Sequence, residues 1–312
     1  MEKFDKYKSK VNWGEGAENL EPIPKIIWSF WDTHSDSELV DLCITQFKKL
    51  VPDFELIILN IKNVKNYLPD ILPVRKDLPF VNYTDLVRLE ILKKNGGIWI
   101  DISTILTENL SWVYDLKENL KYDLLGFYSD FCTTDMQNPI LESWFLATPK
   151  NNKFVSAWHQ EFFACYTSPQ PYEFFKDIKN NKDEIQNIGD LADYLIIYLA
   201  AISVMKKNKD FRISMISANE VGHYFSFRLK SSYQQLADIF LKKASPNHVP
   251  ALIKFTGNQR NYLDREIFLG RYHRNAFLFS ITGGAFPYHK IVKHEINYIK
   301  FILRNLKNKY LK

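Results

Sequence analysis

Two acidic residues and an arginine lie close together in one stretch of this 312-residue chain, at spacings that suit a binding site. Asp85 and Arg88 are three residues apart on an expected helix, so they share one face of it. Asp101 follows a Gly96-Gly97 pair in an apolar strand. A strand-end aspartate often only caps a loop, and an isolated Asp–Arg pair is usually a surface ion pair of little worth. Here the Gly-Gly turn reverses the chain, so the helix lies beside the strand. Both acids, the guanidinium and Trp99 should then converge at one sheet edge, which favours a binding site.

The elements that carry these residues follow from the spacing of apolar side chains. An apolar face over residues 86–92 predicts a helix, for which Thr84 is the expected N-cap. Glycine suits the left-handed position that ends a helix, so the Gly-Gly pair should terminate it. A strand is expected from Ile98. Side chains alternate along a strand, which places on one face Trp99, Asp101 and Ser103.

The preceding residues predict a βαβ unit with a parallel sheet. Lys25–Trp31 and Phe54–Leu59 have the pattern of strands. A helix is expected between these two strands. Ser35 and Glu38 form a capping box at its start, and Pro52 ends it. Later segments alternate again, with strands expected over residues 123–128, 142–147, 211–217 and 252–256 and helices over 152–165 and 190–207. We therefore predict an α/β fold with one domain over residues 1–288.

The positive charge of the chain is concentrated in residues 289–312, where a terminal helix is expected. The formal net charge is +5, and this segment holds seven Lys and Arg residues against Glu295 alone. Its apolar residues recur at the spacing of a helical stripe, namely Val292, Ile296, Ile299, Leu303, Leu306 and Tyr310. Such a basic amphipathic helix can lie on an anionic membrane surface, or it can dock on its own domain with its lysines solvated. No nucleic-acid motif is present, so nucleic acid is not an expected partner.

The cysteines and the apolar runs indicate a cytoplasmic setting. Cys43, Cys132 and Cys165 are widely spaced and include no CxxC pair, so neither a disulfide framework nor a thiolate zinc site is supported. The first ten residues lack the apolar core of a signal peptide. No apolar run approaches the roughly 20 residues that span a bilayer. We expect a reducing compartment and, at most, peripheral attachment to a membrane.

The stretch from Thr84 to Ser103 resembles the nucleotide-sugar site of bacterial capsular polysaccharide synthesis glycosyltransferases. The resemblance lies in the pattern Asp-x-x-Arg…Gly-Gly-x-x-x-Asp, and it extends to residues 23–31 and 141–147. That family is similar to the retaining group that includes yeast-type mannosyltransferases and, more distantly, the clostridial glucosylating toxins. It implies a GT-A fold, in which a mixed, mostly parallel sheet flanked by helices binds a UDP-sugar at the carboxyl ends of its strands.

The resemblance also implies roles for single residues. Asp85 and Arg88 would hold sugar hydroxyls, with Trp99 packed behind them. Asp101 would be the first acid of an Asp-x-Asp motif and would contact the sugar, the ribose and a metal ion. Trp28 would stack on uracil, with core packing as the alternative. Asp85, Arg88 and Asp101 are therefore the catalytic candidates.

Two departures from the family pattern concern the expected divalent cation, Mn²⁺ or Mg²⁺. Ser103 stands where the motif has its second acid. Residues 252–260 resemble a His-x-x-Gly-x-x-Lys segment of related lipopolysaccharide galactosyltransferases, but Lys254 replaces the metal-binding His and Arg260 the diphosphate-binding Lys. These cations prefer several charged oxygen ligands, so a metal site of Asp101 and Ser103 is weakened. The two basic residues could instead neutralise the diphosphate directly.

The implied function is the retaining transfer of a hexose, with galactose or glucose favoured, from a UDP-sugar to a lipid-diphosphate-linked sugar at the inner leaflet. Such a reaction serves capsular or surface polysaccharide synthesis. Candidates for acceptor contact are Glu142, Asp190 and Asp193. More ordinary explanations are that Glu142 is an exposed acid on a strand and that the macrodipole favours Asp190 and Asp193 at a helix N-terminus. One alternative is a catalytically silent module that binds a nucleotide sugar or glycan. Another is a toxin-like transferase that acts on a protein.

Overall fold

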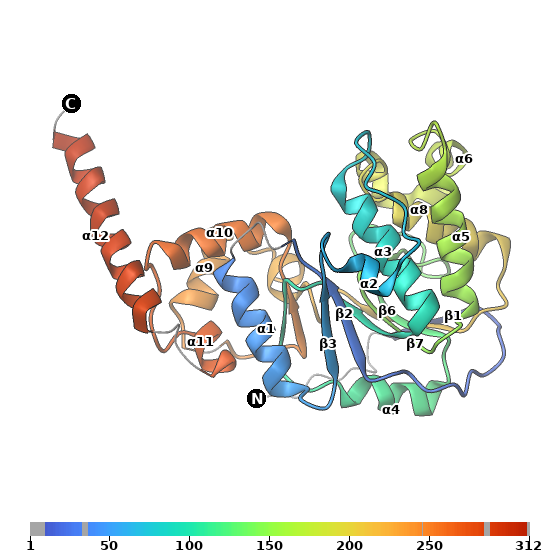
Figure 1. The fold of residues 1–312 in the computed structure, drawn as a ribbon, viewed down its shortest axis with the longest axis horizontal. Coiled ribbons are helices and arrows are strands. Elements are labelled where there is room, and N and C mark those ends of the chain that lie inside the picture. Colours follow the sequence, from blue (N-terminus) through green and yellow to red (C-terminus); the bar gives the residue numbers. More distant parts are fainter. Residues whose placement is uncertain (1–9, 33–36, 245, 284–287, 311–312) are drawn as a thin grey trace.

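A central sheet of seven strands carries the fold of this computed structural model, which describes residues 10–32, 37–244, 246–283 and 288–310 (Figure 1). The strand order is β1-β8-β6-β7-β4-β2-β3. Five strands run in the same direction, whereas β1 and β7 are antiparallel to their neighbours. The sheet is thus mixed and mostly parallel, as predicted. Its strands are β1 (Lys10–Trp13), β2 (Ile26–Phe30), β3 (Glu55–Leu59), β4 (Gly97–Ile100), β6 (Leu124–Tyr128), β7 (Leu141–Thr148) and β8 (Ile213–Ser217).

Helices cover both faces of this sheet over two separate hydrophobic cores. One core packs against α1 (Glu38–Leu50), α4 (Ser111–Leu120), α9 (Tyr233–Leu241), α10 (Gly257–Phe268) and α11 (Phe277–Thr282). The other packs against α2 (Val64–Tyr67), α3 (Phe80–Asn95), α5 (Lys153–Thr167), α6 (Lys176–Asn180), α7 (Lys182–Ile185) and α8 (Ile196–Lys207). The predicted alternation is confirmed in β4, where Ile98 and Ile100 enter the first core and Trp99 enters the second.

A two-stranded ribbon adjoins the sheet at the end of β4. In it β5 (Thr104–Leu106) pairs antiparallel with β9 (Leu252–Lys254), and Thr104 lies opposite Lys254. The backbone N–H of Asp101 still bonds to the Trp144 carbonyl of β7, at 2.8 Å. Asp101 and Ser103 therefore occupy the junction where the chain passes from one sheet to the other.

Three helix starts differ from the predictions. Ser37 caps α1 by accepting the N–H of Val40, while Ser35 lies outside the described residues. α3 begins at Phe80, so Thr84 lies inside the helix and donates its hydroxyl to the Val81 carbonyl at 2.8 Å. Pro79 precedes that helix, and proline suits a helix start because the first turn leaves its N–H groups without intrahelical acceptors.

The helix expected from Asp190 begins later, at Ile196 of α8. The preceding 3₁₀ segment, Gln186–Leu191, contains Gly189 with a φ of 50°. A positive φ interrupts helical geometry, so Asp190 lies in this 3₁₀ segment and Asp193 in the turn after it, and neither is in the first turn of α8.

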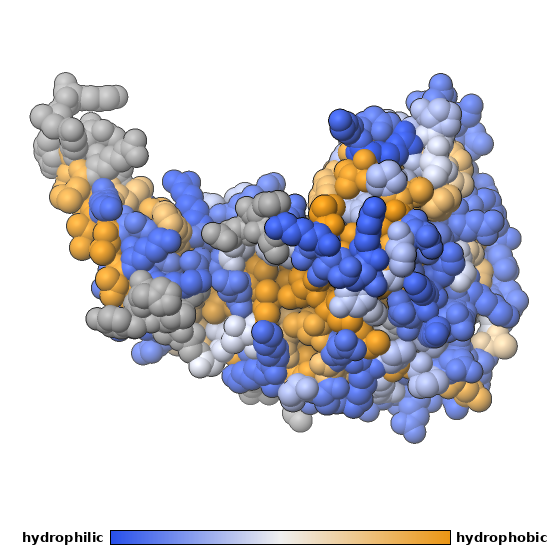
Figure 2. All heavy atoms as spheres, viewed as in Figure 1, coloured by the Kyte–Doolittle hydropathy of each residue, from blue (hydrophilic) through white to orange (hydrophobic). Residues whose placement is uncertain are grey.

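The terminal helix α12 (Tyr288–Tyr310) contacts the domain through its first turns and then projects away from it (Figure 1). The Lys290 ammonium bonds to Glu38 at 2.8 Å and to Asp41 at 3.1 Å, both on α1. Farther along, Ile299 is 57% exposed and Leu303 60%, and Figure 2 shows apolar side chains along this projecting part. Docking on the domain continues to Phe301, whose ring centroid lies 3.9 Å from the Arg271 guanidinium, while the apolar stripe of Ile299 and Leu303 stays exposed.

Among the described residues, none of the helices combines the length and the apolar character needed to span a bilayer. The division of the chain at residue 288 remains a prediction.

The Gly96-Gly97 turn holds α3 against β4. Gly96 has a φ of 65° and Gly97 a φ of 97°. A Cβ on Gly97 would lie 2.7 Å from the Ile26 carbonyl oxygen and 3.1 Å from the indole nitrogen of Trp28. Both the positive φ and the close approach of β2 therefore require glycine here.

Gly97→Ala should lower the free energy of unfolding by about 2 kcal/mol or more, because it adds a methyl group at a strained φ against backbone atoms. Urea denaturation measures this change. Gly257→Ala is the matched control, since a Cβ there meets no atom within 4 Å and the substitution should change stability little. Equal stability of the two variants would contradict the expectation.

Candidate active site

A buried guanidinium joins the two acids that the sequence grouped. Arg88 donates to Asp85 at 2.6 Å, one turn earlier on α3, and to Asp101 at 2.9 Å, just beyond β4. It also bonds to the Ser143 hydroxyl on β7 at 2.6 Å. The side chains of Asp85 and Arg88 are almost fully buried, whereas that of Asp101 is 27% exposed. The three residues therefore lie together, and Asp101 is the one most open to a ligand.

Trp99 holds one oxygen of Asp101 in place. Its indole N–H donates to Oδ1 of Asp101 at 3.0 Å, the same oxygen that Arg88 contacts. The guanidinium of Arg88 lies over the Trp99 ring, 4.9 Å from its centroid. Trp99 is buried behind the pair, which is the placement that the family resemblance implied.

Lys254 contacts the other oxygen of Asp101. Its ammonium lies 3.0 Å from Oδ2 of Asp101, 3.0 Å from Oγ of Ser103 and 3.2 Å from the Phe255 carbonyl. The pairing of β5 with β9 brings these residues together although they are far apart in the sequence. An ammonium group thus bridges the two residues that were expected to ligate a metal.

Burial and nearby charge act in opposite directions on the two aspartates. Burial raises the pKa of Asp85 to about 7, although the Arg88 charge opposes the rise. Burial also disfavours ionised Asp101, but the charges of Lys254 and Arg88 outweigh it and hold the pKa of Asp101 below its usual value. Near neutral pH, Asp101 is therefore ionised, while Asp85 titrates.

These side chains line a cavity of about 350 Å³, and Glu142 and His223 contribute to its lining as well. Glu142 on β7 accepts the indole N–H of Trp144 and lies 3.4 Å from Nε2 of His223. Tyr194 and Tyr198 also line the cavity. Both side chains of the Glu142–His223 pair are buried. The volume is within the range typical of small-molecule sites, about 300–1,000 Å³.

Sequence reasoning did not single out His223, Ser143 or Tyr198. His223 follows β8, and its buried Nδ1 has no hydrogen-bond partner among the described residues. In the sequence it is a lone histidine in a loop, without a spacing that links it to the acidic residues. Its position depends on the pairing of β8 with β6 and of β6 with β7.

The structure does not support the expected roles of Trp28, Asp190 and Asp193. Trp28 is 3% exposed, and its N–H donates to the Gly96 carbonyl at 2.9 Å, so it belongs to the core and is not open to stacking on a base. Asp190 and Asp193 are exposed and do not line the cavity, although their neighbours Leu191 and Tyr194 do. Glu142 is the predicted acceptor contact that does line it.

Arg260 lies on α10, outside the residues that line the cavity. Its guanidinium lies 4.8 Å from the centroid of the Trp31 ring. Trp31 follows the end of β2. The expected contact between Arg260 and a diphosphate stays a prediction.

The donor set does not suit a divalent cation. Mg²⁺ and Mn²⁺ prefer several oxygen ligands, carboxylates above all. Oδ1 of Asp101 already accepts hydrogen bonds from Arg88 and Trp99, and Oδ2 forms an ion pair with Lys254. Within the described parts of the chain, no three His, Cys, Asp or Glu side chains are grouped so that they could hold a metal ion. The residues present therefore do not fit the expected metal.

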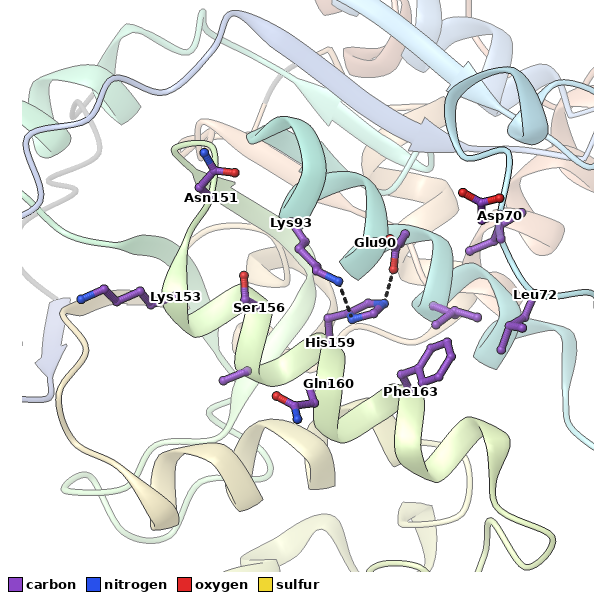
Figure 3. Close-up of a pocket in the computed structure, with 13 residues that line it drawn as sticks. Asp70, Leu72, Glu90, Lys93, Asn151, Lys153, Ser156, His159, Gln160 and Phe163 are labelled. Atoms are coloured by element: carbon purple, nitrogen blue, oxygen red, sulfur yellow. Dashed lines mark hydrogen bonds and ion pairs between the residues drawn. The ribbon is translucent and has the colours of Figure 1, made fainter.

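A larger hollow, of about 780 Å³, lies between α3 and α5 (Figure 3). Three of its polar groups contact one another: His159 lies between Glu90 and Lys93 and contacts both. Neither Asp85 nor Arg88 lines it. The catalytic candidates Asp85, Arg88 and Asp101 thus line the smaller cavity and not this hollow.

A family model described as "Capsular polysaccharide synthesis protein" matches residues 2–245, well over half of the chain. The chain belongs to this family. The match confirms the resemblance inferred from the stretch between Thr84 and Ser103. In this capsular polysaccharide synthesis protein, Lys254, Arg260 and α12 lie beyond the matched residues.

Solved glycosyltransferase structures resemble this family member at low sequence identity. "PaToxG Glycosyltransferase" is 15% identical over 84% of this chain and 88% of its own, with a TM-score of 0.35. Mouse xyloside xylosyltransferase 1 is 8% identical over 76% and 99%, with a TM-score of 0.43. Galactosyltransferase LgtC, in complex with donor and acceptor sugar analogs, is 12% identical over 86% and 99%, with a TM-score of 0.39. At this level the likeness assigns no activity to the chain. Among curated protein sequences, none matches it significantly.

Asp85→Asn should flatten the pH dependence of stability. With a pKa of about 7 when folded and 3.8 as its ordinary value, Asp85 binds a proton in the folded state over an interval where the unfolded chain has lost it. Its contribution to the free energy of unfolding therefore falls as pH rises from about 4 to 7, by up to about 1.4 kcal/mol per pH unit, and levels off above. Urea denaturation at pH 5, 6, 7 and 8 measures the difference between variant and wild type. Identical pH profiles would contradict the raised pKa.

Proposed function

We propose that this protein transfers a hexose from a UDP-sugar to an acceptor hydroxyl in the synthesis of capsular or surface polysaccharide. The observation that carries the proposal is the placement of Arg88 between Asp85 and Asp101 on the wall of a cavity. Carboxylates and guanidinium groups bind sugar hydroxyls through strong, charge-assisted hydrogen bonds. Family membership supports the role in polysaccharide synthesis. Galactose and glucose are the favoured donor sugars.

The proposed reaction is a substitution at the anomeric carbon of the sugar. The bond from this carbon to the diphosphate oxygen breaks, and the electron pair leaves with UDP. The acceptor oxygen forms the new bond and loses its proton. We propose retention, so that a UDP-α-hexose yields an α-linked product. Positioning of the reactants and electrostatic stabilisation of the leaving group would supply most of the rate.

Asp101 and Arg88 would orient the sugar at one wall of the cavity, and Glu142 with His223 would receive the acceptor. A carboxylate within hydrogen-bond reach can accept the hydroxyl proton as the new bond forms. The His223 imidazole, 3.4 Å from Glu142, lies beside the group that would accept that proton. The indole N–H of Trp144 fixes the carboxylate.

The exposed part of α12 supports an acceptor at a membrane, a lipid-diphosphate-linked sugar. Its apolar side chains Ile296, Ile299, Ile302, Leu303 and Leu306 are all exposed, as are Lys293 and Lys300. Basic amphipathic helices insert such an apolar stripe at the boundary of headgroups and acyl chains, and each basic residue near an anionic surface adds about 1 kcal/mol. We propose that the protein binds peripherally at the cytoplasmic face of the plasma membrane.

Asp101→Asn should lower UDP release from UDP-galactose or UDP-glucose by about 100-fold or more, because it removes charge from the group that would orient the sugar. A coupled assay for UDP measures the rate. Asp193→Asn is the matched control and should be unaffected, since Asp193 lies outside the cavity. Full activity of Asp101→Asn would overturn the proposed site. Stabilisation by a UDP-hexose without turnover would instead favour the binding module.

A double variant, Ile299→Asp with Leu303→Asp, should reduce sedimentation with vesicles rich in phosphatidylglycerol by about tenfold or more, since it places two charges on the apolar stripe. Both residues are exposed, so the fold should be retained. Leu20→Asp, at an exposed leucine remote from α12 in the sequence, is the control. Wild-type binding should weaken as NaCl is raised. Equal vesicle binding by the double variant and the wild type would dismiss this membrane role.

A further inference from the structure

We propose that the ammonium of Lys254 takes the place of a divalent cation, so that donor binding and transfer do not depend on metal ions. The inference rests on the proposed function for the identity of the donor, a uridine diphosphate sugar. It concerns the positive charge that the diphosphate meets in the cavity.

The Lys254 ammonium occupies the position where a metal ion would bind. The ammonium lies 3.0 Å from Oδ2 of Asp101 and 3.0 Å from Oγ of Ser103, the two oxygens that were expected to ligate a metal. A Mg²⁺ ion would need both oxygens at about 2.1 Å. It would then lie within a few ångströms of the ammonium, where repulsion between like charges is strong in a half-buried site.

The backbone around Lys254 holds the residue in this position. Its strand β9 pairs with β5, and its own N–H donates to the Gly222 carbonyl at 2.8 Å. A Cβ on Gly222 would lie 2.5 Å from the Trp144 ring and 3.3 Å from Cβ of Lys254, so the chain is closely packed here. The Lys254 side chain is only 11% exposed. A metal ion could bind only if this packed side chain moved away.

A helix N-terminus adds positive charge beside Lys254. Thr256 and Gly257, which open α10, line the same cavity as Lys254. The N-terminus of a 12-residue helix carries a partial positive charge that favours phosphate groups. A Cβ on Gly257 would meet no atom within 4 Å, which leaves space beside the helix end. A diphosphate in this space would meet both the ammonium and the helix end.

Lys254 would act on the bond that breaks. When the anomeric carbon separates from the diphosphate oxygen, the electron pair stays on that oxygen and UDP gains negative charge. The ammonium remains protonated and stabilises this charge electrostatically. No metal ion is needed for the balance of the step.

The test compares UDP binding by calorimetry and UDP release from UDP-glucose and UDP-galactose, each in EDTA and in MnCl₂. We expect the dissociation constant and the rate to agree within twofold between the two conditions. MnCl₂ alone should give no binding heat. Loss of UDP binding or of turnover in EDTA, restored by MnCl₂, would overturn metal independence and leave the transfer reaction intact. Absence of binding and of turnover with all three nucleotides in both conditions would overturn the proposed function as well.

Variants of Lys254 separate its charge from its packing. Lys254→Met should weaken UDP binding about tenfold and lower turnover about 100-fold or more, in EDTA and in MnCl₂ alike. Lys254→Arg keeps the charge and should retain metal-independent binding, which shows that the loss does not come from misfolding. Lys62→Met, the same change at an exposed lysine, should have no effect. Wild-type UDP affinity in Lys254→Met would contradict the proposal.

The paired change Ser103→Asp with Lys254→His replaces the ammonium by carboxylate and imidazole ligands. This variant should bind Mn²⁺, detected by electron paramagnetic resonance, where the wild type does not. Mn²⁺ bound by the wild type in the presence of UDP, and lost in Asp101→Asn, would overturn the proposal.

Discussion

The buried guanidinium of Arg88 is the interaction on which this site depends. A buried carboxylate such as Asp85 beside the partly buried Asp101 would be costly without a partner, because an unpaired charge loses its hydration in the protein interior. Arg88 gives Asp85 and Asp101 a common partner, and Ser143 takes up a further N–H. The cluster therefore forms only if α3 packs correctly beside β4 and if β4 pairs with β7 in the right register. The Gly96–Gly97 turn sets the first of these relations, and the pairing of β4 with β7 sets the second.

The junction between the two sheets gives Asp101 a third partner, Lys254. Because the chain leaves β4 at Ile100 and enters β5 at Thr104, Asp101 stands at the end of one sheet and beside the ribbon of the other. The ribbon brings in Lys254 from the distant strand β9. One oxygen of Asp101 thus belongs to the sheet, through Trp99 and Arg88, and the other to the ribbon. This division holds the carboxylate in one orientation at the cavity wall.

Local spacing was enough to predict the fold class and the core of the site. Asp85, Arg88 and Asp101 lie on one helix and the strand that follows it, so helical and strand periodicity determine their relative placement. Trp28 was harder, because an aromatic residue in a strand has the same pattern whether it faces a ligand or, as here, the Gly96 carbonyl. His223 could not be found from the sequence, since two strand pairings, of β8 with β6 and of β6 with β7, bring it to Glu142. Thr84 failed as a cap because Pro79 offered an earlier helix start.

The terminal helix shows why spacing alone could not distinguish docking from exposure. Both alternatives need the same stripe of apolar residues, and the contacts of Lys290 with α1 and of Phe301 with Arg271 show how far docking extends. α1 is in turn joined to α10, since Asp264 accepts the Ser37 hydroxyl at 2.7 Å and the Leu39 N–H at 2.8 Å. The N-terminus of α10 lines the cavity beside Lys254. The helix proposed to contact the membrane is therefore connected, through two packed helices, to the end of the site proposed to hold the diphosphate. Such a connection would orient the cavity relative to the surface on which a lipid-linked acceptor lies.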